Sequence, residues 1–198
     1  GISFTLERGR TLGIVGESGS GKSVLSRTII DILAKDGSVL YDGKILFEGR
    51  DLRQLPEKEM REIRGREIAM IFQDPMSSLN PVKKIGKQIT EVLTKRMGMN
   101  EGAAKTRAAD LIDSVGIPDA QRQLGRYPMH LSGGMRQRVA IAIAIACEPK
   151  LLIADEPTTA LDVTIQAQIL NLLRQQQRER NMSMIFVTHN LGIVSGYT

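Results

Sequence analysis

The sequence contains little of what defines several other classes of protein. It has 198 residues with no tryptophan, 4% aromatic residues and one cysteine, Cys147. A single cysteine cannot form a disulfide within the chain, which is typical of proteins from a reducing compartment such as the cytoplasm. No stretch approaches the roughly 18 consecutive apolar residues that predict a membrane-spanning helix. We therefore expect any attachment to a membrane to be made through a partner.

A large excess of one sign of charge is also missing. Lysine and arginine number 27 against 22 aspartates and glutamates, a formal net charge of +5. This balance suits a polyanionic nucleotide or an anionic membrane face, but it is too small to indicate nucleic acid as a partner. Hydrophobic residues make up 41% of the chain and charged residues 25%, ordinary values for a soluble globular domain. A chain of this length buries roughly 70% of its unfolded surface, enough for one substantial core.

What the sequence does contain is a glycine-rich segment, GESGSGKS at residues 16–23, that fits the pattern G-x-x-x-x-G-K-[ST]. Its glycines allow backbone N–H groups to converge on phosphate oxygens, and Lys22 supplies a mobile positive charge. An apolar run, Thr11–Val15, precedes it, and a helix-like stretch at 23–34 follows, so the positive end of a helix dipole faces the anion. The predicted phosphate-binding residues are Gly16, Glu17, Ser18, Gly19, Ser20, Gly21, Lys22 and Ser23.

A second segment, LLIADE at residues 151–156, is an apolar run that ends in two carboxylates. A buried strand of a parallel sheet would bring its carboxyl end to the phosphate site. Asp155 would then hold Mg²⁺, directly or through water, and Glu156 would orient or deprotonate the attacking water. By itself such a run is as well explained as a capped strand, and the phosphate loop upstream favours the functional interpretation.

A third segment, LSGGM at residues 131–135, predicts another anion-binding helix start. Ser132 is a good N-cap, and Gly133 and Gly134 expose backbone N–H groups at the beginning of a helix. One nucleotide does not need both helix starts. The simplest explanation is that two chains share each nucleotide, although Ser-Gly-Gly alone would be an ordinary loop.

Together these segments resemble the nucleotide-binding domain of an ABC transporter over essentially the whole chain. The corresponding motifs are Walker A at 16–23, the Q-loop at Gln73, the signature at 131–135, Walker B at 151–156, the D-loop at 160–162 and the switch histidine at His189. FQDPMSSLNP at 72–81, SGGMRQRV at 132–139 and DEPTTALDV at 155–163 resemble the oligopeptide, dipeptide and nickel importer branch. Asn190 departs from the family, which more often has aspartate there, and so does Met129-His130 before the signature.

The resemblance implies an α/β fold, a P-loop NTPase of the ABC ATPase type. Its RecA-like core would carry a small antiparallel β part and a helical subdomain. The core would comprise residues 1–73 and 131–198, and the helical subdomain 74–130. Residues 1–4 begin in an expected strand, and the chain stops soon after His189. Domains of this family normally carry an adenine-stacking aromatic residue just upstream, and this chain offers no candidate for it. We therefore expect a single domain that is truncated at both ends and weakly active by itself.

The resemblance also implies the site, its cofactors and its partners. ATP and Mg²⁺ would be the cofactors, with Glu156, His189 and Gln73 as catalytic residues. The implied metal ligands are Ser23, Gln73 and Asp155, and the residues reaching the nucleotide of the opposite chain would be Ser132, Gly133, Gly134 and Asp162. The protein would form a head-to-tail homo- or heterodimer and would bind transmembrane permease subunits, and indirectly a solute-binding protein. It would lie at the cytoplasmic side of the cell membrane and import peptides or nickel.

Hydrophobic patterns predict further elements. Strands are expected at 2–6, 67–72 and 184–188, a hairpin of 39–41 and 44–47 around Asp42-Gly43, and helices at 56–64, 82–97, 100–115 and 163–180, with a loop of Pro, Ser and Asn after Asp74. VAIAIAIA at 139–146 alternates with the period of a strand, but every position is apolar and Ser132 supplies a helix start. We interpret it as a buried helix.

Two other functions share parts of this pattern. An ABC-type ATPase of DNA maintenance or translation has the same ATP motifs, but residues 74–130 show no coiled-coil heptads and no long basic arm. A phosphate-binding module without hydrolysis is disfavoured by the presence of Lys22, Asp155, Glu156 and His189 together. We therefore favour the transporter and expect no nucleic acid.

Overall fold

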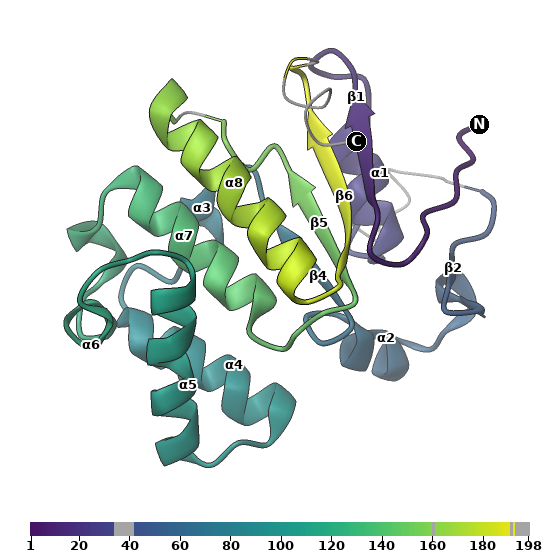
Figure 1. The fold of residues 1–198 in the computed structure, drawn as a ribbon. Helices are drawn as coiled ribbons and strands as arrows, with labels where there is room; N and C mark the ends of the chain where they lie inside the picture. The colour runs from purple at the N-terminus through teal and green to yellow at the C-terminus, as the bar shows by residue number, and fades with distance from the viewer. Residues whose placement is uncertain (34–41, 160, 191, 193–198) are drawn as a thin grey trace.

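A computed structural model describes residues 1–33, 42–159, 161–190 and 192. Its central feature is a four-stranded sheet in the order β1 (Thr11–Val15), β6 (Ser183–Thr188), β5 (Leu151–Asp155), β4 (Ile68–Ile71). All neighbouring strands are parallel, and their carboxyl ends are in register: Val15 pairs with Thr188, Asp155 with Val187. Four strand ends therefore meet at one edge of the sheet (Figure 1). The predicted α/β class is confirmed.

Helices cover both faces of this sheet. Helices α1 (Lys22–Ile29) and α2 (Glu57–Ile63) lie on one face, and α7 (Gly133–Ile145) and α8 (Val163–Glu179) on the other (Figure 1). Alternate strand residues enter different cores: Ile153 and Ile185 pack on the side of α1, while Leu152, Ala154 and Phe186 pack on the side of α7. Burial on both faces explains why β5 and β6 read as unbroken apolar runs.

Between β4 and α7 the chain is helical. Helices α4 (Ile85–Met97) and α5 (Glu101–Ser114) are long, and α6 (Ala120–Leu124) is short. Asn100 caps α5 as expected, its side chain accepting a hydrogen bond from Ala103 N at 2.9 Å. The apolar faces of these helices join the core that includes α7. No described helix is long and apolar enough to cross a membrane.

The antiparallel part contains a hairpin that the sequence did not predict. Strands β2 (Leu46–Phe47) and β3 (Arg50–Asp51) pair around a turn at Glu48-Gly49, six residues beyond the expected Asp42-Gly43 turn. Residues 39–41 of the expected hairpin lie outside the described residues. The strand predicted at 2–6 was wrong: residues 1–7 have no regular structure, and Ile2 is 72% exposed. Alternation predicted a strand there, but none of the described strands pairs with the segment.

Some helix boundaries also differ from the predicted ones. Helix α1 ends at Ile29, earlier than the predicted helix at 23–34, whose last residue is outside the described part. Pro56 is the N-cap of α2 and not its first helical residue. The segment after Asp74, expected as a loop, forms α3 (Pro75–Ser78), which Asp74 caps by accepting from Met76 N at 2.8 Å. Residues 82–84 precede α4 and are not helical. The buried helix behind the signature is confirmed as α7.

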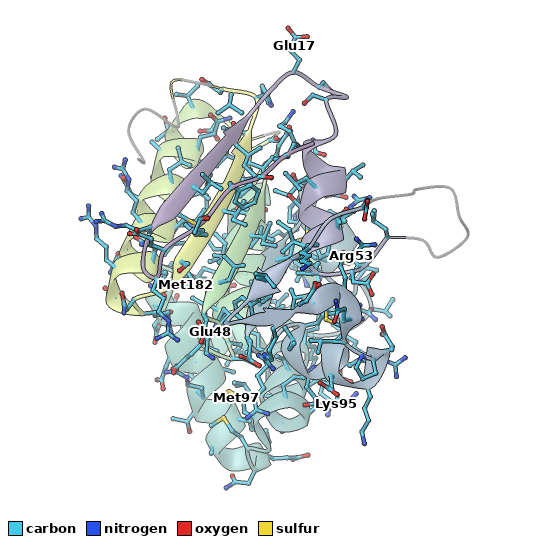
Figure 2. All side chains as sticks on the ribbon, turned by 90° about the vertical axis from the view of Figure 1, so that its right-hand side faces the viewer. Glu17, Glu48, Arg53, Lys95, Met97 and Met182 are labelled. Atoms are coloured by element: carbon cyan, nitrogen blue, oxygen red, sulfur yellow. The ribbon has the colours of Figure 1, made fainter. Side chains whose placement is uncertain are left out.

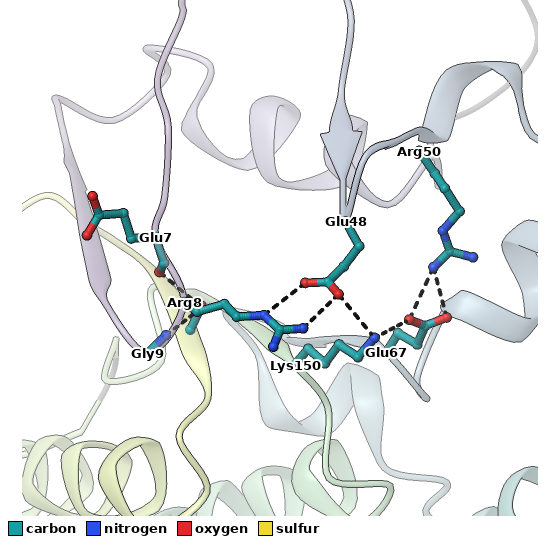
Figure 3. Close-up of polar contacts among 8 residues, drawn as sticks. Glu7, Arg8, Gly9, Glu48, Arg50, Glu67 and Lys150 are labelled. Carbon is teal, nitrogen blue, oxygen red and sulfur yellow. Dashed lines mark hydrogen bonds and ion pairs between the residues drawn. The ribbon is translucent and has the colours of Figure 1, made fainter.

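An ion-pair ladder of Arg8, Glu48, Lys150, Glu67 and Arg50 joins the N-terminal segment, the β2–β3 hairpin and the starts of β4 and β5 (Figure 3). Arg8 Nη2 lies 2.7 Å from Glu48 Oε2, and Lys150 Nζ lies 3.5 Å from the same oxygen and 3.0 Å from Glu67 Oε2. Arg50 Nη2 donates to both Glu67 oxygens at 3.1 Å. The ladder ties the hairpin to the amino ends of the sheet strands.

Candidate functional site

The phosphate loop connects β1 to α1 at the carboxyl edge of the sheet. Gly19 and Gly21 have φ values of 82° and 88°, a left-handed backbone that suits glycine. Lys22 is 8% exposed, and its Nζ donates to the carbonyl oxygens of Gly16 at 2.8 Å and Glu17 at 2.7 Å. Its charge therefore lies over the loop. Figure 2 shows Glu17 at the opposite end of the molecule from Lys95 and Met97 of α4.

Ser23 and Asp155 meet beside this loop. Ser23 Oγ donates to Asp155 Oδ1 at 3.1 Å, and Asp155, at the end of β5, is 2% exposed. Burial raises the pKa of the Asp155 carboxyl, and the Ser23 hydrogen bond only partly opposes this. A buried carboxylate beside a hydroxyl fits Mg²⁺, which prefers oxygen ligands. No cluster of three His, Cys, Asp or Glu able to hold a metal exists among the described residues.

Glu156 lies at the centre of what we call the Glu156 cluster: Gln73, Glu156, Thr159 and His189. A single oxygen, Glu156 Oε2, accepts from Gln73 Nε2 at 3.1 Å and from Thr159 Oγ1 at 2.9 Å. His189 Nδ1 lies 3.4 Å from the same oxygen. Gln73 follows β4, Glu156 follows β5 and His189 follows β6, so parallel strand ends bring the three together.

The signature residues begin a different helix, α7, on the other face of the sheet. Ser132 is its N-cap, and its Oγ accepts from Met135 N at 3.3 Å. A Cβ on Gly134 would lie 2.8 Å from Ile165 Cγ2, whereas one on Gly133 would lie 3.7 Å from the nearest atom. Gly134 therefore allows close packing of α7 on the first turn of α8. Asp162 caps α8 by accepting from Ile165 N at 2.9 Å.

Sequence reasoning missed Thr159. It belongs to the turn after Glu156, and a threonine in a turn carries no signal of its own, because short hydroxyl residues are common there. Its neighbour Thr158 is 5% exposed, and Gln166 Nε2 donates to the carbonyl oxygens of Thr158 and Leu161, both at 3.1 Å. These bonds fix the turn that carries Thr159. Ala160, inside the expected D-loop, lies outside the described residues.

Comparisons with known proteins agree with this geometry. The chain is 57% identical over 195 residues to the oligopeptide transport ATP-binding protein OppD of Bacillus subtilis, covering 98% of this chain and 54% of the relative. It is 55% identical to the dipeptide transport ATP-binding protein DppD of Lactococcus lactis, covering 99% and 56%. The chain thus spans about half the length of the curated relatives it matches.

Solved structures show the same fold. The dimeric structure of the bacterial ABC transporter cassette MJ0796 superposes with a TM-score of 0.83 at 27% identity, covering 97% of this chain and 80% of that one. The structure of cbiO1 from Clostridium perfringens, part of the ABC transporter complex cbiONQ, gives 0.82 at 30% identity, covering 100% and 74%. The family model described as ABC transporter matches residues 1–159. The chain therefore belongs to the ABC transporter family and has the P-loop ABC ATPase fold.

Proposed function

We propose that this chain is the ATP-binding and ATP-hydrolysing part of a subunit that energises a peptide importer. The observation that carries the proposal is the Glu156 cluster, which lies beside the Ser23–Asp155 pair and the phosphate loop. The relatives support a peptide as the solute, because their names specify oligopeptide or dipeptide transport. They favour peptides over nickel, and transport over an ATPase that acts on nucleic acid.

In this proposal the loop and Lys22 bind the β- and γ-phosphates of ATP. Lys22 would exchange its bonds to the Gly16 and Glu17 carbonyls for phosphate oxygens. Ser23 and Asp155 would hold Mg²⁺, with Gln73 as a further ligand, and the ion would neutralise charge that develops on the phosphates. Such positioning and electrostatic stabilisation account for most catalysis of phosphoryl transfer.

Glu156 would orient and deprotonate the water that attacks the γ-phosphate. Its side chain is 12% exposed, so it is sheltered at the edge of the sheet and still open to a reactant. His189 is 58% exposed and follows β6, which suits a contact with the γ-phosphate from the side of the water. A positioned general base of this kind contributes roughly 10²–10⁴-fold to the rate.

A second chain would complete each site. We propose a head-to-tail homo- or heterodimer in which Ser132, Gly133, Gly134 and Asp162 reach the nucleotide held by the opposite chain. The start of α7 supports this, because its Ser-Gly-Gly N-terminus begins on the other sheet face from α1. The solved MJ0796 cassette is also dimeric.

Residues 74–130 would form a helical subdomain that contacts permease subunits, with residues 1–73 and 131–198 as the nucleotide-binding core. The support is that α4 and α5, which lie between β4 and α7 in the sequence, pack against each other and against α7. Val82, just before α4, is also 80% exposed. The chain would then lie peripherally on the cytoplasmic face of the membrane, and a solute-binding protein would act through the permease.

The test is ATP binding by Lys22→Ala, measured by equilibrium titration with a fluorescent ATP analogue. Loss of the mobile cation should abolish tight binding, whereas Lys150→Ala, at the far end of the sheet, should bind as the parent does. Peptide uptake by cells that carry the Lys22→Ala gene should fail in parallel. Unchanged affinity in Lys22→Ala would mean that the loop is not the nucleotide site.

A further inference from the structure

The Glu156 carboxylate is held asymmetrically. Its Oε2 receives Gln73 Nε2 at 3.1 Å and Thr159 Oγ1 at 2.9 Å, with His189 Nδ1 at 3.4 Å. Its Oε1 accepts no hydrogen bond from the described part of the chain. One oxygen therefore fixes the orientation of the group, and the other is left for a reactant.

The three residues beside Oε2, two hydrogen-bond donors and the nearby His189, reach it from different parts of the chain. Gln73 and His189 come from the ends of other strands, and the proposed function gives each a second task, at the metal and at the γ-phosphate. Thr159 is three residues from Glu156 in the same turn, and Thr159 N donates to Glu156 O at 3.2 Å. Its hydroxyl therefore reaches the carboxylate from within the same turn and does not depend on the position of another strand.

The turn itself is constrained. Glu156 has φ of 48°, a left-handed conformation that a residue with a side chain rarely adopts, and its N–H donates to Val187 O at 3.0 Å. Gln166 Nε2 donates hydrogen bonds to the backbone carbonyl oxygens of Thr158 and Leu161, which follow in the chain. This backbone brings the Thr159 hydroxyl to the carboxylate, and it persists only because surrounding bonds enforce it.

We propose that Thr159 is the positioning residue for Glu156: when Gln73 and His189 turn to the metal and the γ-phosphate, the Thr159 hydroxyl alone keeps Oε2 fixed and aims Oε1 at the attacking water. This inference rests on the proposed function of Glu156. In the step, Oε1 takes a proton from water as the water oxygen bonds to the γ-phosphorus. The bond from that phosphorus to the bridging oxygen breaks, and ADP keeps the electron pair.

The test compares Thr159→Val, which keeps the shape and removes the hydroxyl, with Thr159→Ser, which keeps the hydroxyl. Both are measured as ATP turnover by the full chain assembled in its transporter. Thr159→Val should lower kcat by about 10- to 100-fold, the scale of a misaimed catalytic group, with the KM for ATP unchanged. Thr159→Ser should stay close to the parent. Equal losses in both variants, or a raised KM in Thr159→Val, would show a merely structural role.

A double-mutant comparison separates this inference from the function it rests on. In a Glu156→Gln background the Thr159→Val change should add almost no further loss, because a positioning residue acts only through the group it positions. If Glu156→Gln alone turns over ATP normally, the base assignment is wrong. If Glu156→Gln loses turnover and Thr159→Val does not, the base stands and the role of Thr159 is wrong.

Discussion

The two ends of the parallel sheet shift the pKa of a carboxyl group in opposite directions. At the carboxyl end, burial dominates at Asp155 and raises the pKa of its carboxyl, because Ser23 compensates only in part. At the amino end, burial also acts on Glu67, but hydrogen bonds from Lys150 and Arg50 outweigh it and lower the pKa of that carboxyl. The burial of the Asp155 carboxyl is thus compensated only in part by the chain, whereas Glu67 has Lys150 and Arg50 as partners.

The sign of each shift gives the two ends opposite effects on stability. Asp155 has a raised pKa in the folded state, so it contributes stability at low pH. That stability is lost as the pH rises from the pKa of the unfolded state through the pKa of the folded state. Glu67, with a lowered folded pKa, contributes stability above its unfolded value that is lost as the pH falls through its folded value. At neutral pH the ionised Asp155 therefore lowers the stability of the fold, and a bound cation would offset this loss. The ionised Glu67 raises the stability of the fold at the same pH.

The largest effect is expected at the proposed nucleotide site, where Lys22 of one chain and Ser132 of the other would bind the same ATP. Ser132→Arg and Lys22→Ala should each be inactive, because each spoils a different half of the proposed shared site. A mixture of the two chains should regain part of the ATPase activity, since heterodimers keep one intact composite site. Thermal unfolding should stay near the parent for Lys22→Ala. No gain despite demonstrated heterodimers would contradict sharing between chains.

A smaller effect, on stability, is expected where Gly134 at the start of α7 contacts Ile165 of α8. Gly134→Ala places a methyl 2.8 Å from Ile165 Cγ2, on a stiff β-branched side chain, whereas Gly133→Ala meets ordinary contact at 3.7 Å. Overpacking of this kind costs about 1–3 kcal/mol in the free energy of unfolding. Denaturant unfolding should show that loss in Gly134→Ala and little change in Gly133→Ala. Equal stabilities would mean that the two helices separate without cost.

The smallest effect is expected at the amino end. Lys150→Ala removes the cation shared by Glu48 and Glu67. It should lower Tm by about 1–3 °C, because surface ion pairs contribute little each, and leave ATP affinity unchanged. Lys95→Ala, which breaks one exposed pair with Glu91, is the matched control and should change Tm less. A loss of ATP affinity in Lys150→Ala would show that the amino end of the sheet also affects ATP binding.

Much of the site could be predicted because it depends on topology. Once 68–71, 151–155 and 183–188 are parallel strands of one sheet, the residues that follow them share one edge, and Gln73, Glu156 and His189 come together there. The Ser132 cap of α7 and the Asn100 cap of α5 are local and were also readable from sequence.

What the sequence could not supply depends on competition between similar signals or on side-chain geometry. The hairpin turn at Glu48-Gly49 was missed because the stronger Asp42-Gly43 signal lies six residues earlier. Residues 39–41 of the hairpin expected there lie outside the described residues. Alternating Ile2, Phe4 and Leu6 predicted a strand, but pairing needs a neighbour that pattern alone does not reveal. The bond from Thr159 to Glu156 depends on the left-handed Glu156 backbone, which residue identity does not indicate.

The ion-pair ladder has a consequence for how this chain can change over generations. Glu48 contacts Arg8 and Lys150, which lie 40 and 102 positions away in sequence. A reversal of charge at Glu48 would place three positive groups together unless one of those partners also changed. Reversals of charge at Glu48 should therefore occur together with a change at Arg8 or Lys150, which would appear as correlated variation among descendants of the gene, whereas neutral substitutions need no compensation.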